Sequence, residues 1–158
     1  MWTDPIYRIV LFGHRDFNHH NELESRLYPL LKDLISSKPF VQIYIGRNGE
    51  FDLYTATIIK RIQKSIGKDN NEFICVLPYS EKNINDYENY YDYVTIPECI
   101  GTSHPKGAIA KRNRWMVEQA DLFICYIERN EGGAYNALKY AEKLGKEIIN
   151  LANINDQY

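Results

Sequence analysis

The residues best suited to chemistry surround two adjacent glycines. Arg112 lies in a segment with helical periodicity, an apolar run follows at 122–127, and Gly132 and Gly133 precede a second helical pattern. A glycine pair between a strand and a helix lets the backbone approach a ligand, and the first turn of the helix offers free N–H groups to an anion. The pattern indicates a phosphate-binding loop. The alternative is a plain turn in which glycine supplies only a positive φ.

Arg112 is predicted to be buried. On a helical wheel it falls within the apolar side of its segment, and three polar residues fall opposite. The apolar side carries Ala108, Ile109, Trp115 and Met116; the opposite side carries Lys111, Arg114 and Glu118. A buried charge is costly unless it is paired, and arginine is suited to bidentate contact with phosphate or carboxylate. We therefore interpret Arg112 as a ligand contact, with an intrachain pair to an acid such as Asp52 as the alternative.

Two earlier loops carry further candidates. Gly13, His14 and Arg15 follow the first predicted strand, where a doubly wound fold presents backbone to phosphate. A turn role for His14, bonded to backbone, is equally open.

The second of these loops contributes Gly46, Arg47 and Asp52 as ligand contacts. Asp52 is interpreted first as a helix cap and second as an acceptor for ribose hydroxyls.

Three carboxylates are candidates for a general base: Glu50, Glu128 and Glu131. A favourable interaction with a helix dipole is the alternative for Glu50, and surface solvation is the alternative for the other two. Nothing in the sequence selects one of them, so the catalytic residues are unknown. The histidine pair at 19–20 lacks further ligand spacing. We expect neither a metal nor a cofactor.

The elements that must position these residues alternate regularly. Short apolar runs at 7–12, 41–45, 73–77, 122–127 and 146–151 read as strands, and amphipathic segments between them read as helices. This pattern predicts an α/β fold: a single doubly wound, mostly parallel five-stranded sheet of Rossmann-like type, with helices on both faces. The expected strand order is 3-2-1-4-5, with a ligand crevice between the first and fourth strands.

One stretch departs from this alternation. Residues 79–105 are rich in tyrosine, with one β-prone segment at 93–96, and are too long for an ordinary connection. We interpret them as a lid or insertion within a single domain spanning 1–158, and a tyrosine there is a candidate to cover a nucleotide base.

Bulk properties narrow the class of protein. The chain has 158 residues, 44% hydrophobic content and a net charge of -2, which argues against nucleic acid as a partner. No apolar run is long enough to span a membrane. Three cysteines without paired spacing favour a reducing, cytoplasmic setting. The sequence leaves a homodimer open.

The order of these motifs resembles the SLOG superfamily, which includes the "lonely guy" (LOG) phosphoribohydrolases and DNA-processing protein A. The resemblance rests on Arg112, Met116, Ala120 and Asp121 before a strand and a Gly-Gly pair, and on the loops after the first two strands. It covers nearly the whole chain and is strongest toward stand-alone bacterial and phage SLOG proteins. It implies that Arg112, Gly132 and Gly133 hold the phosphate of a nucleotide.

The chain also departs from the LOG pattern. LOG enzymes continue the glycine pair with a third glycine, a threonine and a catalytic glutamate; by the resemblance, Tyr135, Asn136 and Lys139 stand at those positions. Asn136 would keep part of the polar role of the threonine. The expected function is therefore binding of a nucleotide or ADP-ribose-like ligand, to sense or sequester it. The alternative is a nucleotide N-glycosidase or transferase with a relocated carboxylate.

Overall fold

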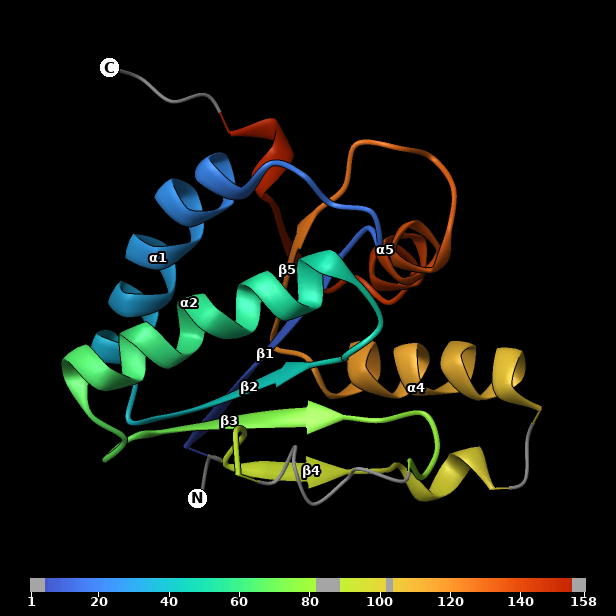
Figure 1. Ribbon diagram of the computed structural model, residues 1–158, viewed down its shortest axis with the longest axis horizontal. Helices are drawn as coiled ribbons and strands as arrows, with labels where there is room; N and C mark the ends of the chain where they lie inside the picture. The colour runs from blue at the N-terminus through green and yellow to red at the C-terminus, as the bar shows by residue number, and fades with distance from the viewer. Residues whose placement is uncertain (1–4, 82–88, 102–103, 155–158) are drawn as a thin grey trace.

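A six-stranded parallel sheet forms the centre of the computed structural model, which describes residues 5–81, 89–101 and 104–154 (Figure 1). The strand order is β4-β3-β2-β1-β5-β6, and every neighbouring pair is parallel. The strands are β1 (Ile6–Gly13), β2 (Phe40–Ile45), β3 (Asn71–Val76), β4 (Tyr93–Thr95), β5 (Leu122–Tyr126) and β6 (Glu147–Asn150). The helices are α1 (His20–Ser37), α2 (Glu50–Ile66), α4 (Pro105–Gln119) and α5 (Gly133–Lys143), with 3-10 turns η1 (Glu98–Ile100) and η2 (Leu151–Asn153).

The sheet confirms the predicted order of five strands and corrects their number. The sixth strand, β4, lies at the edge beyond β3, where Ile74 pairs with Tyr93. It belongs to the tyrosine-rich stretch that the sequence suggested as a lid or insertion. Three residues are too few to establish a period of two, so its pairing with β3 becomes visible only in the folded chain.

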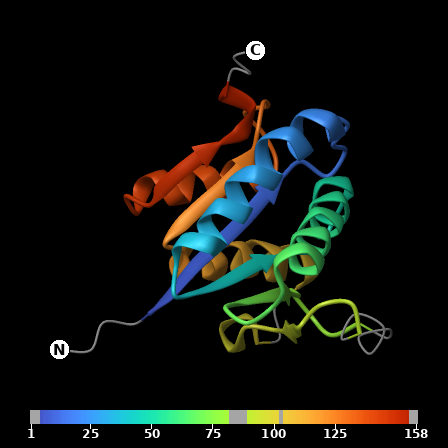
Figure 2. The ribbon, with the colours of Figure 1, turned by 90° about the vertical axis from the view of Figure 1, so that its left-hand side faces the viewer.

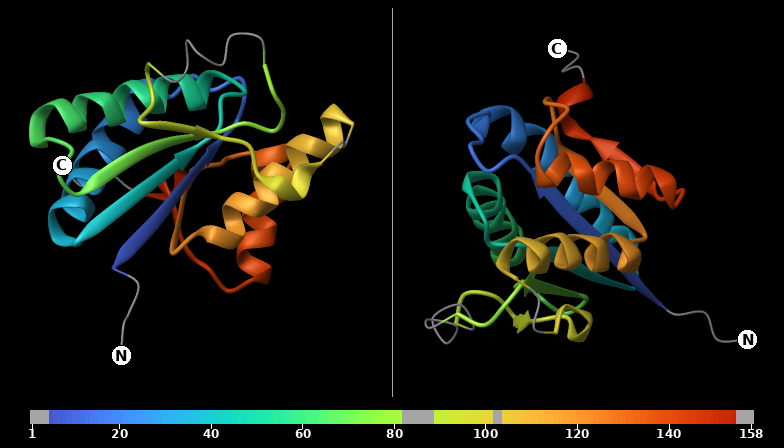
Figure 3. Two further views of the ribbon diagram at one scale, coloured as in Figure 1. Left: turned by 90° about the horizontal axis from the view of Figure 1, so that it is seen from below. Right: turned by 90° about the vertical axis from the view of Figure 1, so that its right-hand side faces the viewer.

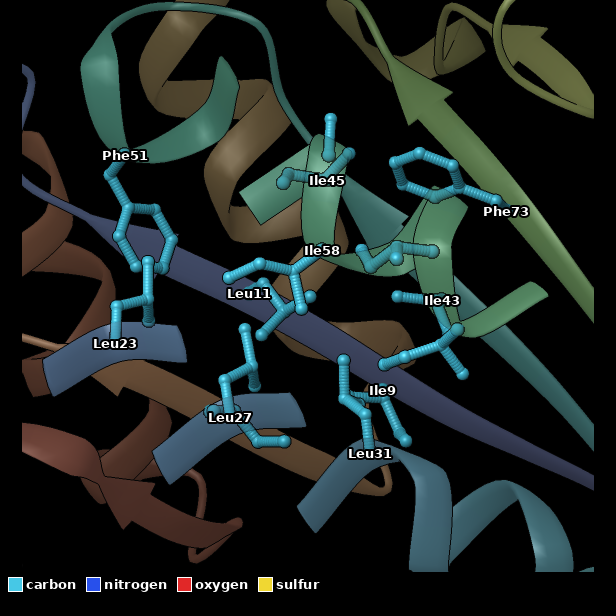
Figure 4. Packing of buried hydrophobic residues seen from close by; sticks show 14 of the residues in the cluster. Ile9, Leu11, Leu23, Leu27, Leu31, Ile43, Ile45, Phe51, Ile58 and Phe73 are labelled. Carbon is cyan, nitrogen blue, oxygen red and sulfur yellow. The ribbon is translucent and has the colours of Figure 1, made fainter. Parts of the chain in front are cut away.

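Alternating side chains of the strands build two separate cores. Ile9 and Leu11 of β1 face α1 and α2, whereas Val10 and Phe12 face α4 and α5. Figures 2 and 3 show these helical layers on opposite sides of the sheet. Figure 4 shows the first core, in which Phe51 of α2 packs beside Leu11 and Leu23. Hydrophobic faces on both sides of a parallel sheet are what anchor α2, α4 and α5 around the strand ends.

The carboxyl ends of β1, β2 and β5 lie next to one another. Gly13, the last residue of β1, is in register with Tyr126 at the end of β5. The chain reverses direction across the sheet between β1 and β5, since β1 continues toward β2 through α1 and β5 continues toward β6 through α5. Such a switch point leaves a crevice beyond the strand ends. Among the described helices, none is long and apolar enough to cross a membrane.

Candidate functional site

A cleft of about 470 Å³ opens at the switch point. Its walls come from the loops after β1, β2 and β5, from one side of α4 and from the first turn of α5. The lining residues of those loops and of the strand and helix ends beside them are Gly13, His14, Arg15, Asp16, Gly46, Asn48, Gly49, Asp52, Arg129, Glu131, Gly132 and Gly133. Ile109, Arg112, Asn113 and Met116 of α4 and Ala134 of α5 complete the lining, with Leu11 and Phe12 of β1 at its base. Eight of the ten predicted ligand contacts therefore surround one cavity.

Arg112 is the most buried charged group in this cleft, with only 3% of its surface exposed. Its Nη1 donates to the carbonyl of Val76 at 2.9 Å and its Nε to Oδ1 of Asn113 at 2.8 Å. Burial lowers the pKa of Arg112, and the nearby Asp52 opposes that shift. The guanidinium remains charged because its intrinsic pKa is so high. No carboxylate of the described residues lies within ion-pair distance of Arg112, so the intrachain ion pair considered from the sequence does not form.

Asp52 lies in the first turn of α2. The helix begins at Glu50 with Gly49 as its N-cap, so Asp52 is not the cap residue that the sequence suggested. Its Oδ2 instead reaches back to accept the N–H of Asn48 at 3.0 Å. Burial raises the pKa of the Asp52 carboxyl above its usual value, and the Asn48 bond and the charge of Arg112 offset only part of that rise. Asp52 thus carries a half-buried carboxyl at the β2 end of the cleft.

Gly46 separates these two opposite charges. A Cβ at Gly46 would lie 2.7 Å from Nη1 of Arg112 and 3.1 Å from Oδ2 of Asp52. Real Cβ atoms do not approach other atoms so closely, and Arg112 is held by two hydrogen bonds. Glycine at this position therefore allows a side chain from α4 and one from α2 to meet over the end of β2.

At positions 13 and 49, packing within the protein itself requires a glycine. A Cβ at Gly13 would lie 2.1 Å from Cγ of Phe51, and a Cβ at Gly49 would lie 2.6 Å from Cα of Arg15. Gly13 does line the cleft, as predicted. The contact that demands a glycine there, however, is with the buried Phe51 ring, and no ligand is needed to explain it.

The two glycines before α5 differ from each other. Gly132 has φ 93° and ψ 176°, a conformation that essentially only glycine adopts. A Cβ at Gly133 would meet only Nδ2 of Asn113, at an ordinary 3.5 Å. The first intrahelical bond joins the N–H of Asn136 to the carbonyl of Gly132, and the N–H groups before it form the positive end of the helix. The turn role is therefore confirmed for Gly132, and the phosphate-binding role stays a prediction for Gly133.

The loops after β1 and β5 are fastened together at the cleft. Nε2 of His14 accepts the N–H groups of Glu128 and Arg129 at 3.3 and 3.2 Å. Arg129 also forms a two-pronged ion pair with Asp16, and Nε2 of His19 lies 3.0 Å from the Glu128 carboxylate. Burial, followed by the charge of Arg129, lowers the pKa of His14, so its ring is neutral at pH 7 and accepts through Nε2.

Several of these groups were missed in the sequence. Asp16 and Arg129 lie 113 residues apart along the chain, and no spacing signal links them. Asn113 was missed because the helical wheel drew attention only to its charged neighbour, Arg112. The signal that would have suggested Asn113 is its place directly after Arg112, because two adjacent polar residues on α4 can both face the glycine loop before α5.

Four predicted residues lie outside the cleft lining. Nη1 of Arg47 donates to the hydroxyl of Tyr91 at 3.4 Å. Asn136 and Glu50 are exposed, and Glu128 pairs with His19. Of the three candidate bases, only Glu131 lines the cleft.

The described tyrosines of the 79–105 stretch do not line the cleft, although Tyr79 lies near enough to Arg112 to affect its pKa. Tyr91 is buried against Phe73, and Tyr93 is 57% exposed on the edge strand. None of the described tyrosines of this stretch lines the cleft. Tyr87 lies outside the described residues.

Comparison with known proteins identifies the fold. No protein-family model and no curated protein matches the chain. The X-ray structure of DNA processing protein A from Streptococcus pneumoniae matches with a TM-score of 0.67 at 13% identity, over 90% of this chain and 49% of that one. DNA processing protein A from Helicobacter pylori, in a structure describing its single-stranded DNA binding mode, matches with a TM-score of 0.59 at 15% identity, over 90% of this chain and 63% of that one. The chain therefore shares the Rossmann-like fold of these two proteins, and it spans less than two thirds of either neighbour.

The second neighbour corrects one prediction. Net charge argued against nucleic acid as a partner, yet a protein with this fold binds single-stranded DNA. The reasoning from net charge was wrong because a whole-chain sum averages both signs over the entire surface. A nucleic acid contacts only the local groups along its path, and three arginines, Arg15, Arg112 and Arg129, gather at this cleft.

Proposed function

We propose that the switch-point cleft binds the phosphate of a nucleotide or of an ADP-ribose-like molecule. The observation that carries the proposal is Arg112, a guanidinium 3% exposed that lines the cleft. Among the described residues no carboxylate lies within ion-pair distance of it, and Asp52 acts on it only from farther away. A buried charge without a contacting counter-ion is costly, and an anion bound against it offsets that cost. Arginine is also the side chain best shaped for bidentate contact with phosphate.

The N-terminus of α5 supports an anion at the same place. Gly133 lines the cleft, has no positive φ and meets nothing closer than 3.5 Å. The protein's own packing therefore does not require a glycine there, whereas close approach of a phosphate to the helix N–H groups does benefit from one. Asn113 connects the two features, since it accepts from Arg112 and lies beside Gly133.

We propose binding as the primary role, ahead of catalysis. Cleaving an N-glycosidic bond requires a carboxylate close to the reacting carbon. Glu50 and Glu128 lie outside the cleft lining, and Glu131 is an exposed residue of its rim. This arrangement supports a domain that senses or sequesters its ligand.

Calorimetry with nucleoside monophosphates, NAD and ADP-ribose tests the proposal. Wild-type protein should bind at least one of these, and Arg112→Gln should abolish binding by removing the charge while keeping a similar shape. Arg114→Gln is the matched control, because Arg114 is exposed on the same helix and outside the cleft lining. Absence of binding to the whole panel, or equal binding by wild type and Arg112→Gln, would refute the proposal.

Single-stranded DNA is a second candidate ligand, favoured by the binding mode of the Helicobacter pylori neighbour. A DNA strand presents the same phosphate chemistry as a nucleotide, so it would use the same arginines. Fluorescence anisotropy with a labelled oligonucleotide, repeated over a salt series, measures this directly. Salt-sensitive binding that a mononucleotide does not displace would favour DNA, and displacement by the mononucleotide would favour a shared phosphate site.

A further inference from the structure

We infer that Asp52 competes with a bound anion for the charge of Arg112, so that the cleft binds its ligand together with a proton. The inference rests on the proposed function, because it assumes a phosphate group bound against Arg112. It adds how that site responds to pH, which the fold leaves open. The argument comes from the positions of two groups of opposite charge that approach each other without pairing.

The two groups meet beside Gly46. A Cβ there would lie 2.7 Å from Nη1 of Arg112 and 3.1 Å from Oδ2 of Asp52, so these two side chains fill the space next to the glycine. No carboxylate of the described residues lies within ion-pair distance of Arg112. Asp52 is therefore a near neighbour that acts on the guanidinium through its charge rather than through a hydrogen bond.

Arg112 keeps hydrogen-bond donors for an anion. Its Nε donates to Asn113, and one N–H of Nη1 donates to the carbonyl of Val76. Nη2 donates to none of the described residues, and Arg112 and Asp52 both line the cleft. Because the two outer nitrogens of a guanidinium are adjacent, an anion bound to either of them also lies close to Asp52.

An ionised Asp52 opposes such an anion, because like charges away from bulk water repel each other. The groups that face the Asp52 carboxyl are Arg112 of α4, Arg15 of the loop after β1, the N–H of Asn48 and the thiol of Cys75 in β3. Burial raises the pKa of that thiol to about 12, so Cys75 stays neutral. Among the described groups that face one another here, Asp52 is therefore the one that can take up a proton.

Protonation changes the repelling carboxylate into a hydrogen-bond donor. Oδ2 accepts the N–H of Asn48 at 3.0 Å, whereas Oδ1 has no hydrogen-bond partner among the described residues and is not sealed from solvent. A proton on Oδ1 leaves the Asn48 bond in place and gives the cleft an O–H donor. Burial already holds the pKa of Asp52 above its usual value, and an anion beside the carboxyl raises that pKa further.

The direction of the pH dependence follows from this second rise. Between the pKa of Asp52 in the free protein and its higher pKa in the complex, binding takes up a proton, so the affinity increases as the pH falls. Below both values the carboxyl is neutral throughout, and the affinity no longer depends on it. Above both values the carboxylate stays ionised, and the affinity is lowest.

Calorimetry over about pH 5 to about pH 8 with wild type and Asp52→Asn tests the inference. The probes are nucleoside monophosphates, NAD and ADP-ribose. Asparagine matches the protonated carboxyl, since its oxygen can accept from Asn48 and its amide can donate to the anion.

We expect Asp52→Asn to bind at least about tenfold more tightly than wild type at about pH 8. This advantage should shrink at lower pH, as wild type takes up its proton. The comparison at each pH cancels the titration of a monoester phosphate, at about pH 6, and that of His14, because both occur with either protein.

Asp33→Asn is the matched control, because Asp33 is exposed on α1, outside the cleft lining, and its loss changes the net charge equally. This variant should match wild type at every pH, and thermal unfolding should show that both variants are folded. Equal affinities of wild type and Asp52→Asn, weaker binding by Asp52→Asn, or an advantage that does not change with pH would each overturn the inference and leave the phosphate site standing. Failure of both proteins to bind any of the probes would instead refute the proposed function.

Discussion

Replacing Gly13 with alanine tests why a glycine ends β1. The new Cβ would lie 2.1, 2.3 and 2.6 Å from Cγ, Cδ2 and Cδ1 of Phe51. Favourable carbon contacts lie near 3.5–4.0 Å, so ring or backbone must move by more than about 1 Å. Phe51 is fully buried and packs edge-on against Phe17, at 5.5 Å between ring centroids. Movement of the ring therefore disturbs the whole first core.

The expected loss of stability follows from two opposing effects. Overpacking a tight core costs about 1–3 kcal/mol. Gly13 has no positive φ, so alanine also restricts the unfolded chain, which returns about 0.4–1 kcal/mol. We expect Gly13→Ala to lower the free energy of unfolding by about 1–2 kcal/mol.

A double-mutant cycle with Phe51→Ala isolates the contact. Phe51→Ala alone should cost about 3–5 kcal/mol through the cavity that it leaves. In that background the added methyl enters the vacated space, so Gly13→Ala should cost at least about 1 kcal/mol less than in wild type. Urea unfolding of the four proteins, followed by circular dichroism, provides the free energies.

Additive effects in this cycle would refute the packing argument. The same proteins also separate packing from ligand contact at Gly13. If the Gly13→Ala variant keeps its stability but loses nucleotide binding, the glycine serves the phosphate and our account of Phe51 is wrong.

Three further predictions concern the loops of the cleft. Gly132→Ala should lower the free energy of unfolding by about 1–3 kcal/mol, because the φ of 93° at this position is unfavourable for alanine. Gly133→Ala should change the free energy of unfolding by less than about 0.5 kcal/mol. Similar values for the two variants in urea titrations would contradict the backbone argument. The pKa of His14 is lowered from 6.5, so as pH falls below that value the unfolded chain takes up the proton first and stability is lost. Thermal unfolding from about pH 7 to about pH 5 should therefore show a shallower decline for His14→Gln than for wild type, and parallel declines would count against this role. Asp16→Asn should weaken the ion pair with Arg129 and leave the Arg129 guanidinium available to a ligand in the cleft. Calorimetry should therefore show tighter nucleotide binding by this variant. Weaker binding would show that Arg129 does not contact the ligand.

Local patterns in the sequence predicted five of the six strands, their order and the position of the candidate cleft. The apolar runs of β1, β2, β3 and β5 are each long enough to indicate burial. The helices that alternate with the strands require right-handed crossovers in one parallel sheet. Glycines after three of these strands mark the edge where a ligand crevice forms. The burial of Arg112 was visible for the same reason, since a helical wheel needs only neighbouring residues.

The roles of individual residues were decided by contacts between distant parts of the chain. Gly13 is a glycine because of Phe51, and Arg47 turns to Tyr91 rather than to the cleft. The ion pair of Asp16 with Arg129 joins residues 113 positions apart in the chain. The short strand β4 is defined by its backbone pairing with the edge of β3. Periodicity records which face of an element is buried, but not which atoms lie across from it. That depends on how the layers pack, and packing at van der Waals distance is what separates a structural glycine or arginine from one left available to a ligand.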